Sequence, residues 1–142
     1  HIEDLPEAIQ KLIHQSIEDT RDNTGMVLTL ALSYGGRQEI IDAVKTIAEQ
    51  VRAGQLSPEE IDSSLFESFL STQPLPDPDL IIRTSGERRI SNFLLYQSAY
   101  TELFYSKVLW PDFSDEDFLN AIIDFQGRER RFGMTQEQIV KA

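Results

Sequence analysis

The sequence contains no cysteine and only two histidines, His1 and His14. Without cysteine the chain can form no disulfide bond, no thiolate zinc site and no cysteine nucleophile. The two histidines do not stand at a spacing typical of metal ligands. No apolar run approaches the roughly 20 residues that a membrane-spanning helix needs. From these absences we expect a cytoplasmic protein without a transmembrane segment.

Positive charge is also scarce, because 13 Lys and Arg stand against 24 Asp and Glu and the formal net charge is −11. Such an acidic chain is not expected to bind nucleic acid, whose phosphate backbone is recognised through basic surface. The arginines are nevertheless clustered, at Arg83, Arg88 and Arg89 and again at Arg128, Arg130 and Arg131. Since a planar guanidinium group pairs bidentately with phosphate oxygens, compact arginine clusters suit a small polyanion such as a diphosphate.

The length of 142 residues predicts a single domain over residues 1–142. Apolar residues at helical spacing predict helices over 4–21, between Gly36 and Gly54, after Ser57, over 91–99 and from Ser114 into the arginines near 130. Short apolar runs predict strands at 26–32, 79–83 and 103–105, the first of them buried on both faces. Helices and strands that alternate are typical of an α/β fold with a parallel sheet flanked by helices.

Ligands of such sheets bind in the loops that follow the carboxyl ends of the strands. Two loops qualify, Ser33-Tyr34-Gly35-Gly36-Arg37 and the stretch RTSGERRISN at 83–92. In the first loop the glycine pair has a simpler interpretation, a tight connection between strand and helix.

The second loop combines a strand end, a glycine, arginines and a serine. Arg83 ends the predicted strand, Gly86 allows close backbone approach, and Asn92 is expected near the start of the next helix, where backbone N–H groups attract anions. With Arg89 and Ser91, this loop could surround one diphosphate. The alternative is that its arginines pair with surface carboxylates.

Five stretches in a fixed order resemble the cis-prenyltransferase family. They are Tyr34-Gly35-Gly36-Arg37, Arg83 through Leu95, Ala99-Tyr100-Thr101-Glu102-Leu103, Leu109-Trp110-Pro111-Asp112-Phe113 and Arg128-Glu129-Arg130-Arg131-Phe132-Gly133. The resemblance covers nearly the whole chain, and five ordered segments are far more specific than any one of them.

The resemblance implies a reaction in which isopentenyl diphosphate is condensed with an allylic diphosphate, such as farnesyl diphosphate, to a polyprenyl diphosphate such as undecaprenyl diphosphate. It implies Mg²⁺, a homodimer, and a product that serves as a membrane lipid carrier for the cell wall. A peripheral position at the membrane is compatible with such a product.

Carried over by position, the resemblance assigns Arg83, Arg89 and Ser91 to the phosphates of isopentenyl diphosphate, with Ile90 in the same segment. Glu102 matches a carboxylate near Mg²⁺. In addition, Arg131 and Gly133 match a motif that reaches the partner subunit's isopentenyl diphosphate.

One part of the family pattern does not occur in these 142 residues, an Asp-Gly-Asn-x-Arg loop that supplies a metal-binding aspartate and the allylic diphosphate pocket. We therefore expect the C-terminal half of the cis-prenyltransferase fold, with no catalytic residue of its own and no activity when isolated. Two other interpretations remain open, a non-catalytic subunit of a heterodimeric prenyltransferase and a simple phosphate-binding α/β domain. The intact Arg83 loop disfavours the former, and the five ordered segments disfavour the latter.

Overall fold

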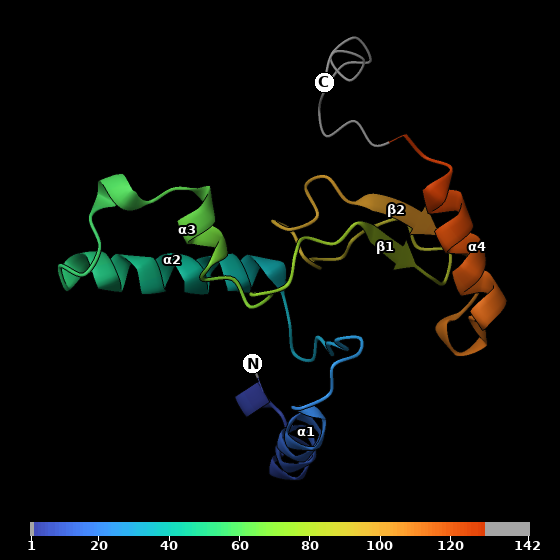
Figure 1. Cartoon of the computed structure of the whole chain (residues 1–142), viewed down its shortest axis with the longest axis horizontal. Helices are drawn as coiled ribbons and strands as arrows, with labels where there is room; N and C mark the ends of the chain where they lie inside the picture. The colour runs from blue at the N-terminus through green and yellow to red at the C-terminus, as the bar shows by residue number, and fades with distance from the viewer. Residues whose placement is uncertain (1, 130–142) are drawn as a thin grey trace.

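The structure, a computed structural model, describes residues 2–129. In chain order its elements are η1 (Ile2–Asp4), α1 (Glu7–Thr20), α2 (Gly36–Arg52), η2 (Pro58–Glu60), α3 (Ser63–Glu67), β1 (Leu80–Arg83), β2 (Glu102–Tyr105), η3 (Trp110–Asp112) and α4 (Asp115–Gln126). In Figure 1, α2 and α3 lie together at one end, the two strands lie in the middle, α4 lies beside the strands at the other end, and α1 stands apart below.

The sheet consists of β1 and β2, which run parallel. Leu80 pairs with Glu102 at one end of the ladder, and Arg83 pairs with Tyr105 at the other. The predicted α/β class with a parallel sheet is therefore confirmed, and so are the two strands predicted at 79–83 and 103–105. Arg83 lies at the carboxyl end of its strand, as the sequence predicts.

The predicted helices α1, α2 and α4 are present with adjusted ends. Helix α1 begins at Glu7, directly after Pro6, because proline suits the N-terminus of a helix but lacks the N–H that its interior requires. At the start of α4, Ser114 Oγ accepts from Asp117 N at 3.2 Å, and Asp117 Oδ2 accepts from Ser114 N at 2.9 Å. The same helix ends at Gln126, before Arg128, so it is shorter than predicted.

The predicted strand at 26–32 is wrong. These residues form no strand, and Met26 is 90% exposed and Leu28 75% exposed. A strand exists only with a hydrogen-bonded neighbour. Within residues 2–129, β1 and β2 pair with each other in a sheet of two strands. The apolar run at 26–32 therefore has the composition of a buried strand, but among residues 2–129 no neighbouring strand forms backbone hydrogen bonds with it.

The predicted helix at 91–99 is also wrong, because this segment is a series of turns. Ser91, Asn92 and Leu94 have φ values of 50°, 65° and 45°, whereas an α-helix needs φ near −60°. No helix begins at Asn92, so the helix N-terminus expected to bind an anion there does not exist. The aromatic side chains of this segment instead make tertiary contacts, Phe93 with Tyr34 and Tyr96 with Phe66, with ring centroids 5.8 and 5.0 Å apart.

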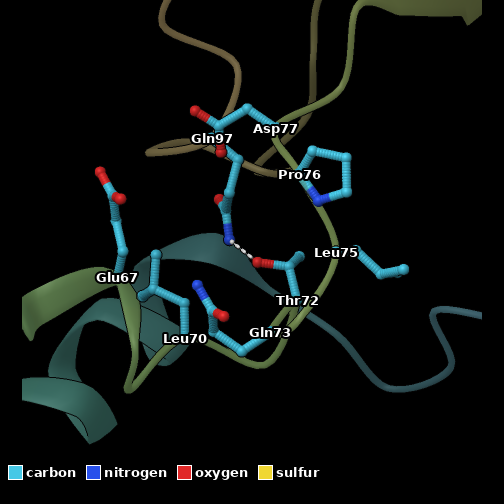
Figure 2. A pocket seen from close by; sticks show the side chains of 8 residues that line it. All are labelled: Glu67, Leu70, Thr72, Gln73, Leu75, Pro76, Asp77 and Gln97. Atoms are coloured by element: carbon cyan, nitrogen blue, oxygen red, sulfur yellow. Dashed lines mark hydrogen bonds between the residues drawn. The ribbon is translucent and has the colours of Figure 1, made fainter. Parts of the chain in front are cut away.

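The buried interior of the described residues is small and includes a polar network. Ala43, Ile47, Leu70 and Ala121 are its buried apolar side chains, and Glu39 and Gln97 are buried with them. Glu39 accepts hydrogen bonds from the Tyr34 hydroxyl at 2.7 Å, Ser71 N at 3.0 Å, the Ser71 hydroxyl, and Gln97 Nε2 at 3.1 Å. Gln97 Nε2 also donates to Thr72 Oγ1 at 3.1 Å, as Figure 2 shows.

The pKa of Glu39 follows from two opposing effects. Burial by itself raises the pKa of this carboxyl, but the hydrogen bonds from Ser71, Tyr34 and Gln97 together outweigh burial, and the pKa lies below its usual value. For Tyr34, burial first and then the contact with Glu39 raise the pKa of the phenol well above its usual value. Glu39 is thus ionised and stabilised by neutral donors that come from three separate parts of the chain.

We predict that Glu39→Gln lowers the free energy of unfolding by about 1–3 kcal/mol near pH 7, because a buried amide cannot accept from all four donors. A carboxyl whose folded pKa is depressed stabilises the fold above its unfolded pKa, about 4.3, and loses that contribution as pH falls through the folded value. The difference between the two proteins should therefore narrow below about pH 4. Urea unfolding at pH 7 and at acidic pH measures it.

The matched control is Glu49→Gln, which removes an exposed carboxylate from the same helix. It should change the free energy of unfolding by no more than about 0.5 kcal/mol. Equal effects of the two substitutions, or a difference that does not depend on pH, would contradict the role given to Glu39.

Candidate functional site

The loop after β1 is held in place by the segment after β2. Ser106 N donates to Arg83 O at 2.8 Å, Ser85 N to Val108 O at 2.8 Å, and Gly86 N to Ser106 O at 2.9 Å. Ser85 and Gly86 both have positive φ, 67° and 69°. This tight turn starts the loop at the carboxyl end of the sheet, which is where parallel sheets bind ligands.

The arginines of this loop differ in their surroundings. Arg83 is half-buried, and its buried Nε has no hydrogen-bond partner among residues 2–129. The side chain of Arg89 is 68% exposed and forms an ion pair with Glu87, and Arg88 is exposed. A buried guanidinium N–H without an acceptor is destabilising, so Arg83 is the position where an anion would compensate most.

Ser91 and Ile90 continue the same segment. Ser91 is exposed with a φ of 50°, and Ile90 is half-buried, with its carbonyl accepting from Phe93 N at 3.0 Å. Arg83, Arg89, Ile90 and Ser91 thus lie within one short stretch of chain that begins at the carboxyl end of β1.

Asn92 joins this loop to the other candidate loop. Its carbonyl accepts from Gly36 N at 2.8 Å, and its side-chain Oδ1 accepts from Arg37 N at 2.9 Å. The two loops that the sequence singles out are therefore in direct contact. Sequence reasoning missed this contact, although the glycine pair before an amphipathic helix was a signal of close backbone approach.

Glu102 lies away from Arg83. The two residues occupy opposite ends of the two-stranded ladder, three residues or about 10 Å apart along the strands. They also lie on opposite faces, since side chains alternate along a strand. The Glu102 carboxylate accepts from Arg128 NH1 at 2.8 Å, and this hydrogen bond is the largest contribution to a raised pKa of Arg128.

Arg128 also binds Asp124 Oδ2 and the Leu103 carbonyl, at 2.5 and 3.1 Å. Among residues 2–129 no group of three or more His, Asp or Glu side chains is arranged to hold a metal ion. The described residues therefore do not form a magnesium site at Glu102 by themselves. A metal role for Glu102 stays a prediction that requires further ligands and release from Arg128.

The pocket in Figure 2 does not suit a diphosphate. It has a volume of about 240 Å³ and lies between the end of α3 and the chain before β1. Its charged lining residues are both acidic, Glu67 and Asp77. Because like charges repel, an anion is expected at the Arg83 loop and not here.

Two predicted site residues, Arg131 and Gly133, lie outside the described residues.

Among residues 2–129, none of the helices has the length and apolar composition of a membrane span.

Comparison with known proteins shows the family. A family profile described as "Putative undecaprenyl diphosphate synthase" matches residues 1–133. An isoprenyl transferase of Chlorobaculum tepidum is 54% identical over 138 residues, which are 97% of this chain and 52% of that protein. A tritrans,polycis-undecaprenyl-diphosphate synthase (geranylgeranyl-diphosphate specific) of Thermoplasma volcanium is 54% identical over 129 residues, 91% of this chain and 50% of that protein.

A solved structure agrees with the sequence comparison. The crystal structure of lavandulyl diphosphate synthase from Lavandula x intermedia, in complex with dimethylallyl diphosphate, matches with a TM-score of 0.88 and 41% identity, over 91% of this chain and 56% of that one. The chain spans about half the length of the curated relatives it matches. Its sequence, its α/β fold and its arginine-serine loop lead to one conclusion: the chain belongs to the undecaprenyl diphosphate synthase family of prenyltransferases.

Proposed function

We propose that this chain carries the isopentenyl diphosphate-binding part of a cis-prenyltransferase. The reaction would form a carbon–carbon bond between the isopentenyl unit and the allylic carbon. The allylic carbon–oxygen bond would break to release diphosphate, and one proton would leave the isopentenyl unit as the new double bond forms. Repeated condensation would give a polyprenyl diphosphate such as undecaprenyl diphosphate. Two relatives support an allylic substrate, since the name of one specifies geranylgeranyl diphosphate and the other was crystallised with dimethylallyl diphosphate.

The observation that carries the proposal is the environment of Arg83. It lies at the carboxyl end of β1, and its buried Nε has no partner within the described chain. Arg89 and Ser91 lie in the loop that follows Arg83, and both are exposed. A diphosphate bound by two guanidinium groups and a hydroxyl would receive charge-assisted hydrogen bonds from all three donors.

The part played by this chain is therefore to bind and orient one substrate. Arg83, whose backbone is fixed by the sheet, would donate hydrogen bonds to one phosphate and neutralise most of the diphosphate charge. Arg89 would leave Glu87 to bind the second phosphate. Ile90, half-buried, would line the apolar side of the segment. Mg²⁺, which the family resemblance implies, would need ligands beyond residues 2–129.

We also propose that the chain is the C-terminal portion of a longer synthase, because it spans only about half of its relatives. The longer protein would form a homodimer in which Arg131 and Gly133 reach the partner's substrate. Product length depends on parts of the site that these 142 residues do not include.

In the longer protein, we predict that Arg83→Ala and Arg89→Ala each weaken isopentenyl diphosphate binding by roughly 10- to 150-fold, the value of one charge-assisted hydrogen bond. Binding of farnesyl diphosphate should stay nearly unchanged. Calorimetric titration of each substrate measures both. The matched control is Arg52→Ala, which removes an exposed arginine at the far end of α2. Equal losses for both substrates would show that the loop serves the whole site or the fold.

A second prediction tests the homodimer. Arg131→Ala in the longer protein should keep the dimer but lose most activity. When it is mixed with Arg83→Ala, part of the rate should return, because one site of the mixed dimer takes its loop from the first variant and its Arg131 from the second. The rate is followed by incorporation of labelled isopentenyl diphosphate.

Subunit exchange must be verified, for example with differently tagged chains. If exchange occurs and no rate returns, Arg131 acts within its own chain or not at all. If Arg131 serves only the stability of its own chain, Arg131→Ala should leave the rate intact.

A further inference from the structure

We propose that Asn92 is a positioning residue for the isopentenyl diphosphate loop, and that the glycine pair at 35–36 forms the surface against which it is held. This proposal rests on the proposed function. It adds a residue that touches no substrate and acts through its neighbours Ser91 and Arg89.

Asn92 satisfies the N-terminus of α2 from a distant part of the sequence. Its carbonyl oxygen accepts from Gly36 N at 2.8 Å, and its side-chain Oδ1 accepts from Arg37 N at 2.9 Å. The first amides of a helix have no partner within the helix and are usually capped by the residue just before it. Here the preceding residue is Gly35, which has no side chain, so Asn92 takes its place.

The backbone around Asn92 is strained in a way that these contacts explain. Ser91, Asn92 and Leu94 have φ values of 50°, 65° and 45°. Left-handed conformations are unfavourable for residues other than glycine, although asparagine tolerates them better than serine or leucine. Such conformations persist only when surrounding contacts impose them. The two hydrogen bonds to α2 are contacts of this kind, and they lie directly beside Ser91.

The glycine pair is required for this close approach. A Cβ atom at Gly36 would lie 3.0 Å from Leu95 Cγ, 3.0 Å from Leu95 N and 3.2 Å from the Asn92 carbonyl oxygen. At Gly35 it would lie 2.8 Å from Asn92 Nδ2. An alanine at position 36 would therefore push the 92–95 backbone away from the helix. The pair is a packing requirement of the substrate loop, more than a flexible connection.

The far end of the segment is fixed separately. Gln97 is only 2% exposed, and its amide donates to Glu39 and to Thr72. Figure 2 shows the second of these hydrogen bonds. Residues 92–97 are thus held at both ends, while Arg83 is held independently by the sheet. Loss of the Asn92 contacts should shift Ser91 and Arg89 relative to Arg83, so that one diphosphate can no longer reach all three.

The test uses Asn92→Gly and Gly36→Ala in the longer protein. Glycine at 92 keeps the left-handed backbone without strain and removes only the side-chain acceptor. Alanine at 36 disturbs the same contact from the other side. Each should raise the KM for isopentenyl diphosphate by roughly 2- to 13-fold, the range expected for loss of one typical hydrogen bond. The KM for farnesyl diphosphate should change less than about 2-fold.

A double-mutant cycle distinguishes a shared contact from two separate effects. If both substitutions act through the contact between Asn92 and α2, the double variant should be no worse than the more affected single variant. The matched controls are Asn23→Gly and Gly25→Ala, both in an exposed turn, and a Cβ at Gly25 meets nothing within 4 Å. These controls should leave both KM values unchanged. Thermal unfolding identifies any variant that fails to fold. If Gly36→Ala fails, the KM of Asn92→Gly alone tests the proposal.

Three results would overturn the proposal. The first is a double variant in which the two fold-changes in the KM for isopentenyl diphosphate multiply. The others are an equal rise in KM for both substrates and an unchanged KM for Asn92→Gly. Arg83→Ala, measured in the same assay, distinguishes failure of the positioning role from failure of the proposed function. If it raises the KM for isopentenyl diphosphate and Asn92→Gly does not, the positioning role alone is wrong. If Arg83→Ala has no effect either, the proposed function and the positioning role both fall.

Discussion

The capping of α2 by Asn92 is the interaction on which the rest of this structure depends. It joins two stretches that are 55 residues apart, the start of α2 and the segment that follows the arginine-serine loop. Helix N-terminal amides need acceptors, and here they take them from the loop instead of from the preceding residue. The same two hydrogen bonds therefore complete a helix and fix the backbone that follows the arginine-serine loop.

The polar network behind this contact extends the same principle. Glu39 lies in the first turn of α2 and is ionised among neutral donors from Tyr34, Ser71 and Gln97. A buried carboxylate is stable only when its hydrogen bonds replace those lost with water. Because each donor comes from a different part of the chain, the carboxylate fixes their relative positions. The small apolar interior does not need to do so alone.

The parts of the fold that could be predicted from sequence are those governed by local patterns. Helices α2 and α4 follow from apolar periodicity, and the Ser114-Asp117 cap marks where α4 begins. The segments at 26–32 and 91–99 could not be predicted, since their conformations depend on partners far away in the sequence. An apolar run is a strand only beside another strand, and an apolar periodicity gives no helix where tertiary contacts impose positive φ.

The candidate site also contains residues that a local motif reveals and residues that only distant contacts reveal. Arg83, Arg89 and Ser91 are recognisable because a family motif places them side by side, and the strand ending at Arg83 follows from its composition. Asn92 and Glu39 act through contacts across 55 and 32 to 58 residues, which no local pattern reveals. Glu102 shows what a motif match leaves open, because the register places it three residues from Arg83 along the ladder and its metal role stays a prediction.

A crystal structure of the longer protein with isopentenyl diphosphate would test most directly whether the Asn92 contact positions the substrate loop. The diphosphate should lie about 3 Å from the guanidinium nitrogens of Arg83 and Arg89 and from the Ser91 hydroxyl, while Asn92 Oδ1 still accepts from Arg37 N. A diphosphate bound elsewhere, or bound at this loop with Asn92 detached from α2, would contradict it.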